Sequence, residues 1–173
     1  MTVKYTIDQS GIEEQVKKLK DFGTIANRHF LTATSKSLFT IQGAVLDAGV
    51  PVGVSGHLRE SLGTKIENKG PMSIVGRFGS SIEDSPYPMV MEKGMPPGTF
   101  PPPAALVLWV RRKINPEEWK VYSVAFNVAR GIYAHGIKGR FFMKRGWAAA
   151  KPKVDAFYKD AIERIVKELV VKK

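Results

Sequence analysis

The chain has 173 residues, of which 43% are hydrophobic and 25% charged, a balance typical of one globular domain. It has no cysteine, which excludes disulfides, thiolate nucleophiles, iron–sulfur clusters and cysteine-ligated zinc. The net charge is +11. Residues 138–173 contribute +7 to it, because they contain eleven basic and four acidic residues. Such a field favours nucleic acid, an anionic surface or an acidic protein as a partner, although a solvated helix face carries the same pattern.

The N-terminal part, residues 9–49, is expected to be helical after a short strand over residues 3–7. Gly23 is expected to interrupt it, so that two helices form. The second has an apolar stripe at helical spacing, made of Phe30, Thr34, Leu38, Ile41 and Val45. Gly49 ends this helix, and Pro51 prevents its continuation.

Residues 50–84 are expected to form a turn and then a β-hairpin. A helical turn is expected over residues 57–62, with Ser55 as its cap. The strands are expected over residues 64–68 and 73–78, because the four residues Asn68-Lys69-Gly70-Pro71 between them have the chemistry of a hairpin connection.

Residues 85–103 are rich in proline and glycine and are expected to be a loop or arm, stiffened by three consecutive prolines. Residues 104–136 are expected to be an inserted pair of helices. Residues 140–173 are expected to hold a C-terminal helix with Pro152 in its first turn. Its apolar stripe is Val154, Phe157, Ala161, Ile165, Val166 and Leu169, widened by Tyr158 and Ile162.

These elements predict a single α+β domain over residues 1–173. A long N-terminal helix and an amphipathic C-terminal helix would pack on a small antiparallel sheet. The proline-rich loop or arm and the helical segment would be additions to that frame. The N-terminus lacks a secretory signal, and no apolar run is long enough to cross a bilayer, so no membrane partner is expected.

Catalytic and cofactor motifs are missing from the sequence. His29, His57 and His135 have no metal-ligand spacing, and neither a nucleophile elbow nor a phosphate-binding loop occurs. No catalytic residue, metal or cofactor is therefore predicted. Glu83, Asp84 and Glu92 leave a small hydrolase as one alternative, but turn capping in a solvated loop explains them more simply.

Cations surround aromatic residues before the C-terminal helix. Lys138, Arg140, Lys144 and Arg145 lie near Phe141, Phe142 and Trp147 in the sequence. Such a cluster can stack single-stranded nucleic acid, which makes a basic nucleic-acid-binding module the main alternative function. Aromatic side chains in such a place also anchor a helix to a core.

Three segments follow one another in an order typical of a known family. The first, residues 50–62, contains Pro51, Gly56, Leu58, Arg59 and Ser61. The second, residues 87–94, contains Tyr87, Glu92 and Gly94. The third, residues 139–147, contains Phe141 and Phe142 before the terminal helix. Together they resemble the neck and tail-completion (minor tail-component) proteins of long-tailed phages, typified by a lambdoid siphophage tail-component protein.

The resemblance implies a structural virion protein, not an enzyme, assembled in the host cytoplasm. It would form a homo-oligomeric ring, hexameric or dodecameric, at the head–tail junction or the tail end, and would link connector and tail. Its neighbours would be connector, head-closure, tail-terminator or tail-tube proteins, with non-specific contact to packaged DNA allowed by the charge. The ten motif residues are expected to organise the fold or its interfaces.

Two of these residues have a specific expected role. Arg59 offers five donors, which are expected to tie loops together through Glu60, Glu92 or backbone carbonyls. Tyr87 is expected to bury its ring and to form a hydrogen bond at its hydroxyl.

Overall fold

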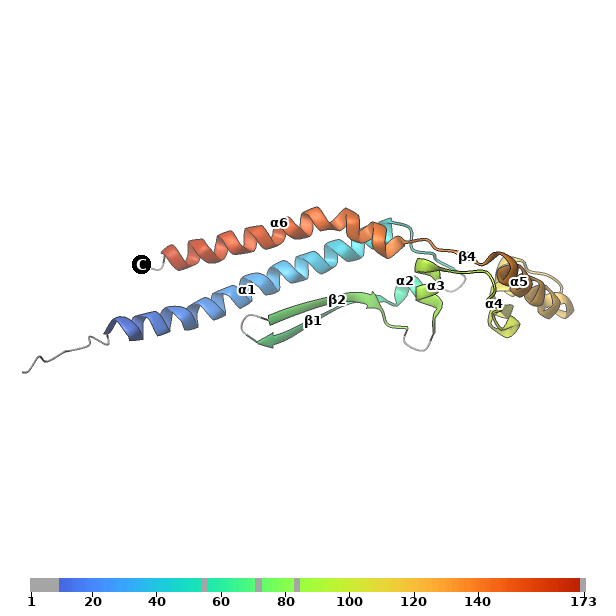
Figure 1. Ribbon diagram of the computed structural model, residues 1–173, viewed down its shortest axis with the longest axis horizontal. Coiled ribbons are helices and arrows are strands. Elements are labelled where there is room, and N and C mark those ends of the chain that lie inside the picture. The colour runs from blue at the N-terminus through green and yellow to red at the C-terminus, as the bar shows by residue number, and fades with distance from the viewer. Residues whose placement is uncertain (1–9, 54–55, 71–72, 83–84, 172–173) are drawn as a thin grey trace, which may run out of the picture. The chain divides into compact units, whose positions relative to one another are not determined.

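The computed structural model describes residues 10–53, 56–70, 73–82 and 85–171 (Figure 1). The protein is 67% helical with two small antiparallel sheets, which confirms the predicted α+β class. The elements are α1 (Ser10–Asp47), α2 (His57–Glu60), β1 (Leu62–Gly70), β2 (Ser73–Ser80), α3 (Tyr87–Lys93), β3 (Gly94–Met95), α4 (Pro103–Lys113), η1 (Glu118–Lys120), α5 (Val121–His135), β4 (Ile137–Lys138) and α6 (Phe142–Val171). The strand predicted over residues 3–7 lies outside the described residues.

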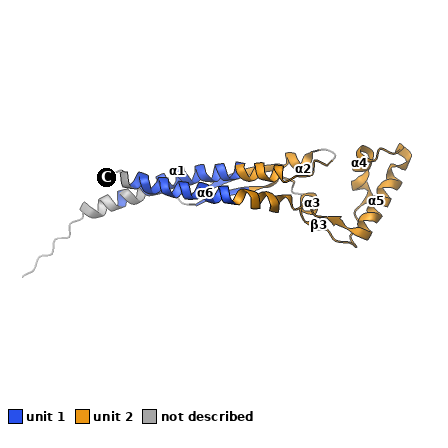
Figure 2. Cartoon of the chain, turned by 90° about the horizontal axis from the view of Figure 1, so that it is seen from above, with its two compact units in different colours: residues 1–39, 65–77, 152–173 blue, residues 40–64, 78–151 orange. Residues whose placement is uncertain are grey.

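The chain divides into two compact units (Figure 2). Unit 1 comprises Met1–Phe39, Lys65–Arg77 and Pro152–Lys173. Unit 2 comprises Thr40–Thr64 and Phe78–Lys151. Helices α1 and α6 and both strands of the β1–β2 hairpin therefore contribute residues to each unit.

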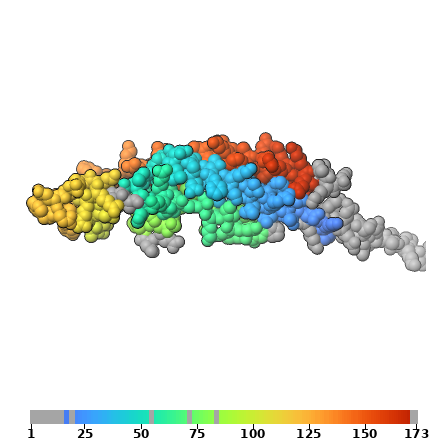
Figure 3. Space-filling view, turned by 180° about the vertical axis from the view of Figure 1, so that it is seen from behind, coloured from blue at the N-terminus to red at the C-terminus, as the bar shows by residue number. Residues whose placement is uncertain are grey.

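In unit 1, α1 lies between α6 and the hairpin, which Figure 3 shows as blue, red and green bands. Toward α6, Ile25 and Ala26 of α1 form a buried cluster with Ile165. Toward the hairpin, a Cβ added to Gly76 of β2 would lie 2.8 Å from Cγ2 of Thr34, so this strand rests directly on the helix. The predicted packing of the two long helices and the sheet is thus present in this unit.

The spacing of apolar residues in α1 predicted its buried side correctly. Thr34, Leu38 and Val45 are buried, and Phe30 and Ile41 pack at the edges of the two cores. The predicted interruption at Gly23 is wrong, because α1 runs through it as one helix. A glycine inside a helix costs only about 0.5–1 kcal/mol relative to alanine, and Phe22 and Ile25 on either side pack into the same cluster.

Helix α6 differs from the prediction in where its proline lies. The helix begins at Phe142, so Pro152 sits inside it and not in its first turn. Proline removes one backbone hydrogen bond there, but Ala150 and Val154 on either side are both buried and continue the packed face. Ala161 and Ile165 are buried as predicted, whereas Ile162 and Val166 are exposed, so the apolar face is narrower than the stripe suggested.

Residues 85–103, predicted to be a loop or arm, contain a helix and a strand and belong to unit 2. The prediction of a loop or arm is therefore corrected. Helix α3 and strand β3 lie within these residues, and β3 pairs antiparallel with β4 through Gly94–Lys138 and Met95–Ile137. Beyond β3, the Gly98 amide donates to the Tyr133 carbonyl oxygen over 2.8 Å. The helix was missed because Pro88 reads as a breaker, although in a first helical turn its missing N–H costs little.

The predicted pair of inserted helices is present as α4 and α5. Their contact buries Val110, Val121 and Ala125, and the small side chains on α5 allow a close approach. Asn115 makes the turn between them with φ 49°, a left-handed conformation that asparagine tolerates better than most residues.

Candidate interaction site

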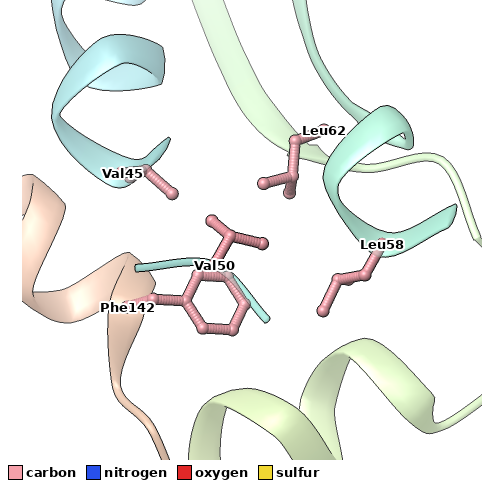
Figure 4. Packing of buried hydrophobic residues seen from close by; sticks show 5 residues of the cluster. All are labelled: Val45, Val50, Leu58, Leu62 and Phe142. Carbon is pink, nitrogen blue, oxygen red and sulfur yellow. The ribbon is translucent and has the colours of Figure 1, made fainter. Parts of the chain in front are cut away.

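The three sequence segments that carry the family resemblance meet in the core of unit 2 (Figure 4). Leu58 and Leu62 from the first segment pack with Phe142 from the third, together with Val45 and Val50. The Phe142 side chain is only 1% exposed. Met91 of the second segment is partly buried against the same cluster. Distant parts of the sequence thus share one apolar core.

The turn of the first segment is built by residues that the sequence singled out. Pro51 is buried. Gly56 has φ 75°, a left-handed conformation that favours glycine, and it precedes the first residue of α2. Ser61 Oγ donates to the Leu58 carbonyl oxygen over 2.8 Å and lies 2.7 Å from Ser80 Oγ of β2. The proposed cap Ser55 lies outside the described residues.

Arg59 does not form the predicted clamp. Its side chain is exposed, and among the described residues no hydrogen bond or ion pair joins it to Glu60, Glu92 or a carbonyl oxygen. Glu92, one of the expected partners, accepts hydrogen bonds from the beginning of α6. Arg59 therefore remains a candidate only for contact with a partner.

Glu92 binds the N-terminus of α6. Its Oε2 accepts a hydrogen bond from the Met143 amide over 2.9 Å, and its Oε1 accepts one from the Lys144 amide over 3.0 Å. The first amides of a helix have no partner within the helix, and a carboxylate there also interacts favourably with the helix dipole. Glu92 therefore caps a distant helix, and it does not cap a turn in a solvated loop as predicted.

Glycine residues allow the second and third segments to approach each other closely. Gly94 has φ 86°, and a Cβ there would overlap the Ile137 carbonyl oxygen and lie 2.6 Å from the Gly139 nitrogen. Phe141 then turns the chain into α6 with φ 51°, while its amide donates to the Glu92 carbonyl oxygen over 2.9 Å. Both predicted residues therefore set the path of the backbone.

Tyr87 does not bury its ring as predicted, because its side chain is 38% exposed. Its hydroxyl faces Gly53, where an added Cβ would lie 3.1 Å away. Tyr87 lines a groove of about 620 Å³ in unit 2. The Tyr87 ring is accessible because it lines this groove and does not belong to the buried core.

The groove has apolar walls. One wall consists of Pro51, Val52 and Gly53 with Tyr87, Val90 and Met91, and the other of Leu106, Trp109, Val128 and Ile132. Ile137 of β4 also lines it. Its two charged lining residues are the cations Lys113 and Arg140. Neither cationic side chain forms a hydrogen bond or ion pair within the described part of the chain.

A second apolar surface lies on α5 and η1, on a side that α4 does not cover. Four exposed aromatic residues recur there at helical spacing, Trp119, Tyr122, Phe126 and Tyr133. Trp119 is 77% exposed. The Lys120 ammonium lies 4.5 Å from the centroid of the Trp119 ring. Phe100 packs edge-on against Phe126 and against Tyr133. We call these five residues the aromatic stripe.

The excess positive charge is not confined to the predicted C-terminal segment, residues 138–173, but begins well before it. Residues 93–154 contain twelve basic residues and only two acidic ones, a net charge of +10. The two acidic residues, Glu117 and Glu118, are paired with Lys120 and Arg111. The aromatic stripe and the second wall of the groove therefore lie in the basic part of the chain.

The predicted basic and aromatic cluster before α6 divides in the structure. Phe142 is a core residue, whereas Phe141 and Trp147 are 45% and 47% exposed. Arg145 donates to the Ala48 carbonyl oxygen over 2.7 Å and so serves the fold. The aromatic residues of this cluster thus do not form one stacking platform.

In unit 1, Arg28 and His29 of α1 share a carboxylate partner, Glu168 of α6. His29 Nε2 lies 3.0 Å from Glu168 Oε2, and Arg28 donates to the same oxygen over 2.5 Å. Both hydrogen bonds lower the pKa of Glu168 below its ordinary value, and the bond with His29 has the larger effect. His29 thus has a carboxylate partner on α6. Glu83 and Asp84 lie outside the described residues.

No three histidine, aspartate or glutamate side chains are grouped among the described residues as ligands of a metal. None of the helices described is both long enough and apolar enough to cross a bilayer.

The chain matches no known family profile, no curated protein and no solved structure.

The groove was not found from the sequence. Trp109 and Lys113 are one helical turn apart on α4, a spacing that does place them on one side. Ile132 and Arg140, however, come from other elements, and nothing in their sequence neighbourhood indicates that they face Trp109. The pairing of β3 with β4, which places Ile137 opposite Met95, joins residues more than 40 positions apart in the chain.

Proposed function

We propose that this chain is a non-enzymatic structural subunit that assembles into a ring at the head–tail junction or tail end of a phage-type particle. The observation that carries the proposal is the convergence of the three resemblance segments on one packed junction in unit 2. Leu58 and Phe142 fill its core, and Glu92 holds the start of α6. The structural roles of Leu58, Phe142 and Glu92 support this proposal.

The surface of unit 2 suits an assembly subunit. Large exposed apolar areas on a soluble protein mark sites of interaction with other proteins. The aromatic stripe contributes exposed rings to one side of α5, and the groove offers an apolar concavity elsewhere on the same unit. In a closed ring each copy contacts its neighbours through exposed surface of its own, which the aromatic stripe can supply, and this leaves the groove for a different protein.

The test is the oligomeric state together with the location of the protein. Mass photometry of the purified chain, followed by electron microscopy, is expected to show closed rings, and immunogold labelling is expected to mark the neck or tail end of particles. Trp119→Ser on the aromatic stripe is expected to weaken the ring without loss of helix content. A strictly monomeric protein that is absent from particles would contradict the proposal.

A basic nucleic-acid-binding module is the second candidate, favoured by the net charge of +10 over residues 93–154. It predicts binding to duplex or single-stranded DNA whose affinity falls steeply as salt increases. An affinity that does not change with salt, or no binding at about 0.1 M salt, where charges are already screened over short distances, would remove it.

A further inference from the structure

We infer that the groove of unit 2 binds an acidic, amphipathic segment of a partner protein. This deepens the proposed assembly role by naming the chemistry of one partner of the same unit, and it rests on that role only in taking the partner to be a protein. The juxtaposition that carries it is an apolar groove of about 620 Å³ whose lining includes two cations, Lys113 and Arg140, that have no partner among the described residues.

The walls specify an apolar side of the occupant. Most of the lining is aliphatic, with Met91, Leu106 and Ile132 as the larger members, and Trp109 adds a ring that is 41% exposed. Aliphatic walls of this kind accept leucine, isoleucine or phenylalanine side chains projecting from a helix or extended strand. Nucleic acid is disfavoured, because it needs a row of cations along its backbone and flat faces for its bases.

The two cations in the lining indicate that the occupant carries negative charge. Lys113 ends α4 and Arg140 follows β4, so the two cations come from different elements of the groove. Neither has a carboxylate partner among the described residues. An occupant with glutamate or aspartate beside its apolar anchors would satisfy both, and guanidinium and ammonium groups beside an apolar surface bind carboxylates more strongly than in open water.

A second copy of this chain is a poorer occupant. Residues 93–154, which contain the aromatic stripe and the second wall of the groove, have a net charge of +10. Placing the aromatic stripe of one copy in the groove of another would bring these like charges together, which costs free energy at low salt. Charge complementarity therefore favours a different chain that is acidic.

The probe is a set of three fluorescein-labelled peptides of about 16 residues, long enough for four helical turns. The first has leucine and phenylalanine anchors at helical spacing, flanked by glutamates. The second replaces the glutamates by lysines, and the third replaces the anchors by serines. With the full-length chain, fluorescence anisotropy is expected to show micromolar binding of the first peptide alone, weakening as salt rises.

Matched variants locate the binding. Lys113→Glu is expected to weaken the acidic peptide roughly tenfold or more, while Arg130→Glu, an equal charge change on exposed α5 outside the groove, is expected to leave binding nearly unchanged. Trp109→Ala is expected to weaken it similarly, whereas Trp119→Ala is not, because Trp119 does not line the groove. Circular dichroism of each variant checks that the helices are retained.

Several results would overturn the inference. They are no binding of the acidic peptide, equal binding of the lysine peptide, or equal effects of the groove variants and their controls. Binding of laurate without the peptide would assign the groove to a small anionic amphiphile, and self-association lost in Trp109→Ala without peptide binding would assign it to a second copy. Mass photometry tests the ring separately, so a ring without peptide binding contradicts only this inference, and peptide binding without a ring contradicts only the ring.

Discussion

Gly146 of α6 lies directly against Val45 of α1, so close that a Cβ added to the glycine would fall 2.5 Å from the Val45 Cα. Both residues are buried in unit 2. Because the obstacle is backbone, Gly146→Ala must push the two helices apart, and we expect it to destabilise the protein by about 1–3 kcal/mol. Urea unfolding followed by circular dichroism measures this change.

Gly43 supplies the matched control for that variant. It also lies inside a helix, but a Cβ there would meet nothing within 4 Å. Gly43→Ala is therefore expected to stabilise the protein by about 0.5–1 kcal/mol through helix propensity alone. If both substitutions stabilise, the close helix contact at Gly146 is absent.

Phe141 and Phe142 are neighbours with opposite surroundings. Phe142→Ala removes a ring that is 1% exposed, and we expect a loss of about 3–5 kcal/mol in unfolding free energy. Phe141→Ala removes a half-exposed ring and should cost far less. Chemical denaturation of the two single variants compares them directly, and equal losses would contradict the buried cluster of Figure 4.

Glu92 joins α3 to the first turn of α6. Glu92→Ala leaves the Met143 and Lys144 amides without their acceptor, and we expect it to destabilise the protein by about 0.5–2 kcal/mol. Glu92→Gln keeps one acceptor oxygen and should lose less. Glu60→Ala, at an exposed carboxylate, is the control, and an equal effect there would argue against a specific cap.

Glu168 predicts a pH dependence of the stability of unit 1. Hydrogen bonds from His29 and Arg28 lower its pKa in the folded protein below the unfolded value of 4.5. Its contribution is therefore fully present above pH 4.5 and is lost as the pH falls through the lower, folded pKa. Urea midpoints measured at a series of pH values should show this loss, and the same series in Glu168→Gln should be flatter. Parallel curves for the two proteins would contradict the assignment.

Local pattern was sufficient for much of the fold. The helical spacing of Thr34, Leu38 and Val45 predicted the buried side of α1, because residues three and four apart lie on one side of a helix whatever surrounds it. Turn chemistry at Asn68 likewise predicted the hairpin, and its side-chain oxygen does accept a hydrogen bond from the Gly70 amide over 3.2 Å.

The errors came from residues whose local tendency was overridden by packing. Gly23 was expected to interrupt a helix and Pro152 to lie in a first helical turn, yet both lie inside long helices whose flanking residues are packed. Arg59 read as a clamp from its donors alone, but its expected partner Glu92 binds the N-terminus of α6. Propensity is worth at most a few kcal/mol at one residue, so tertiary contacts decide such cases.

By itself the sequence determined the class of the protein and its charge. Periodic apolar residues fix α+β content, and composition fixes an excess of positive charge with no cysteine, because these properties depend only on which residues are present and on their local spacing. Only the tertiary structure decided that Trp109, Ile132 and Arg140 line one groove and that Gly146 meets Val45. Those relationships join residues far apart in the chain, and their geometry exists only once the β3–β4 pair and the start of α6 are in place.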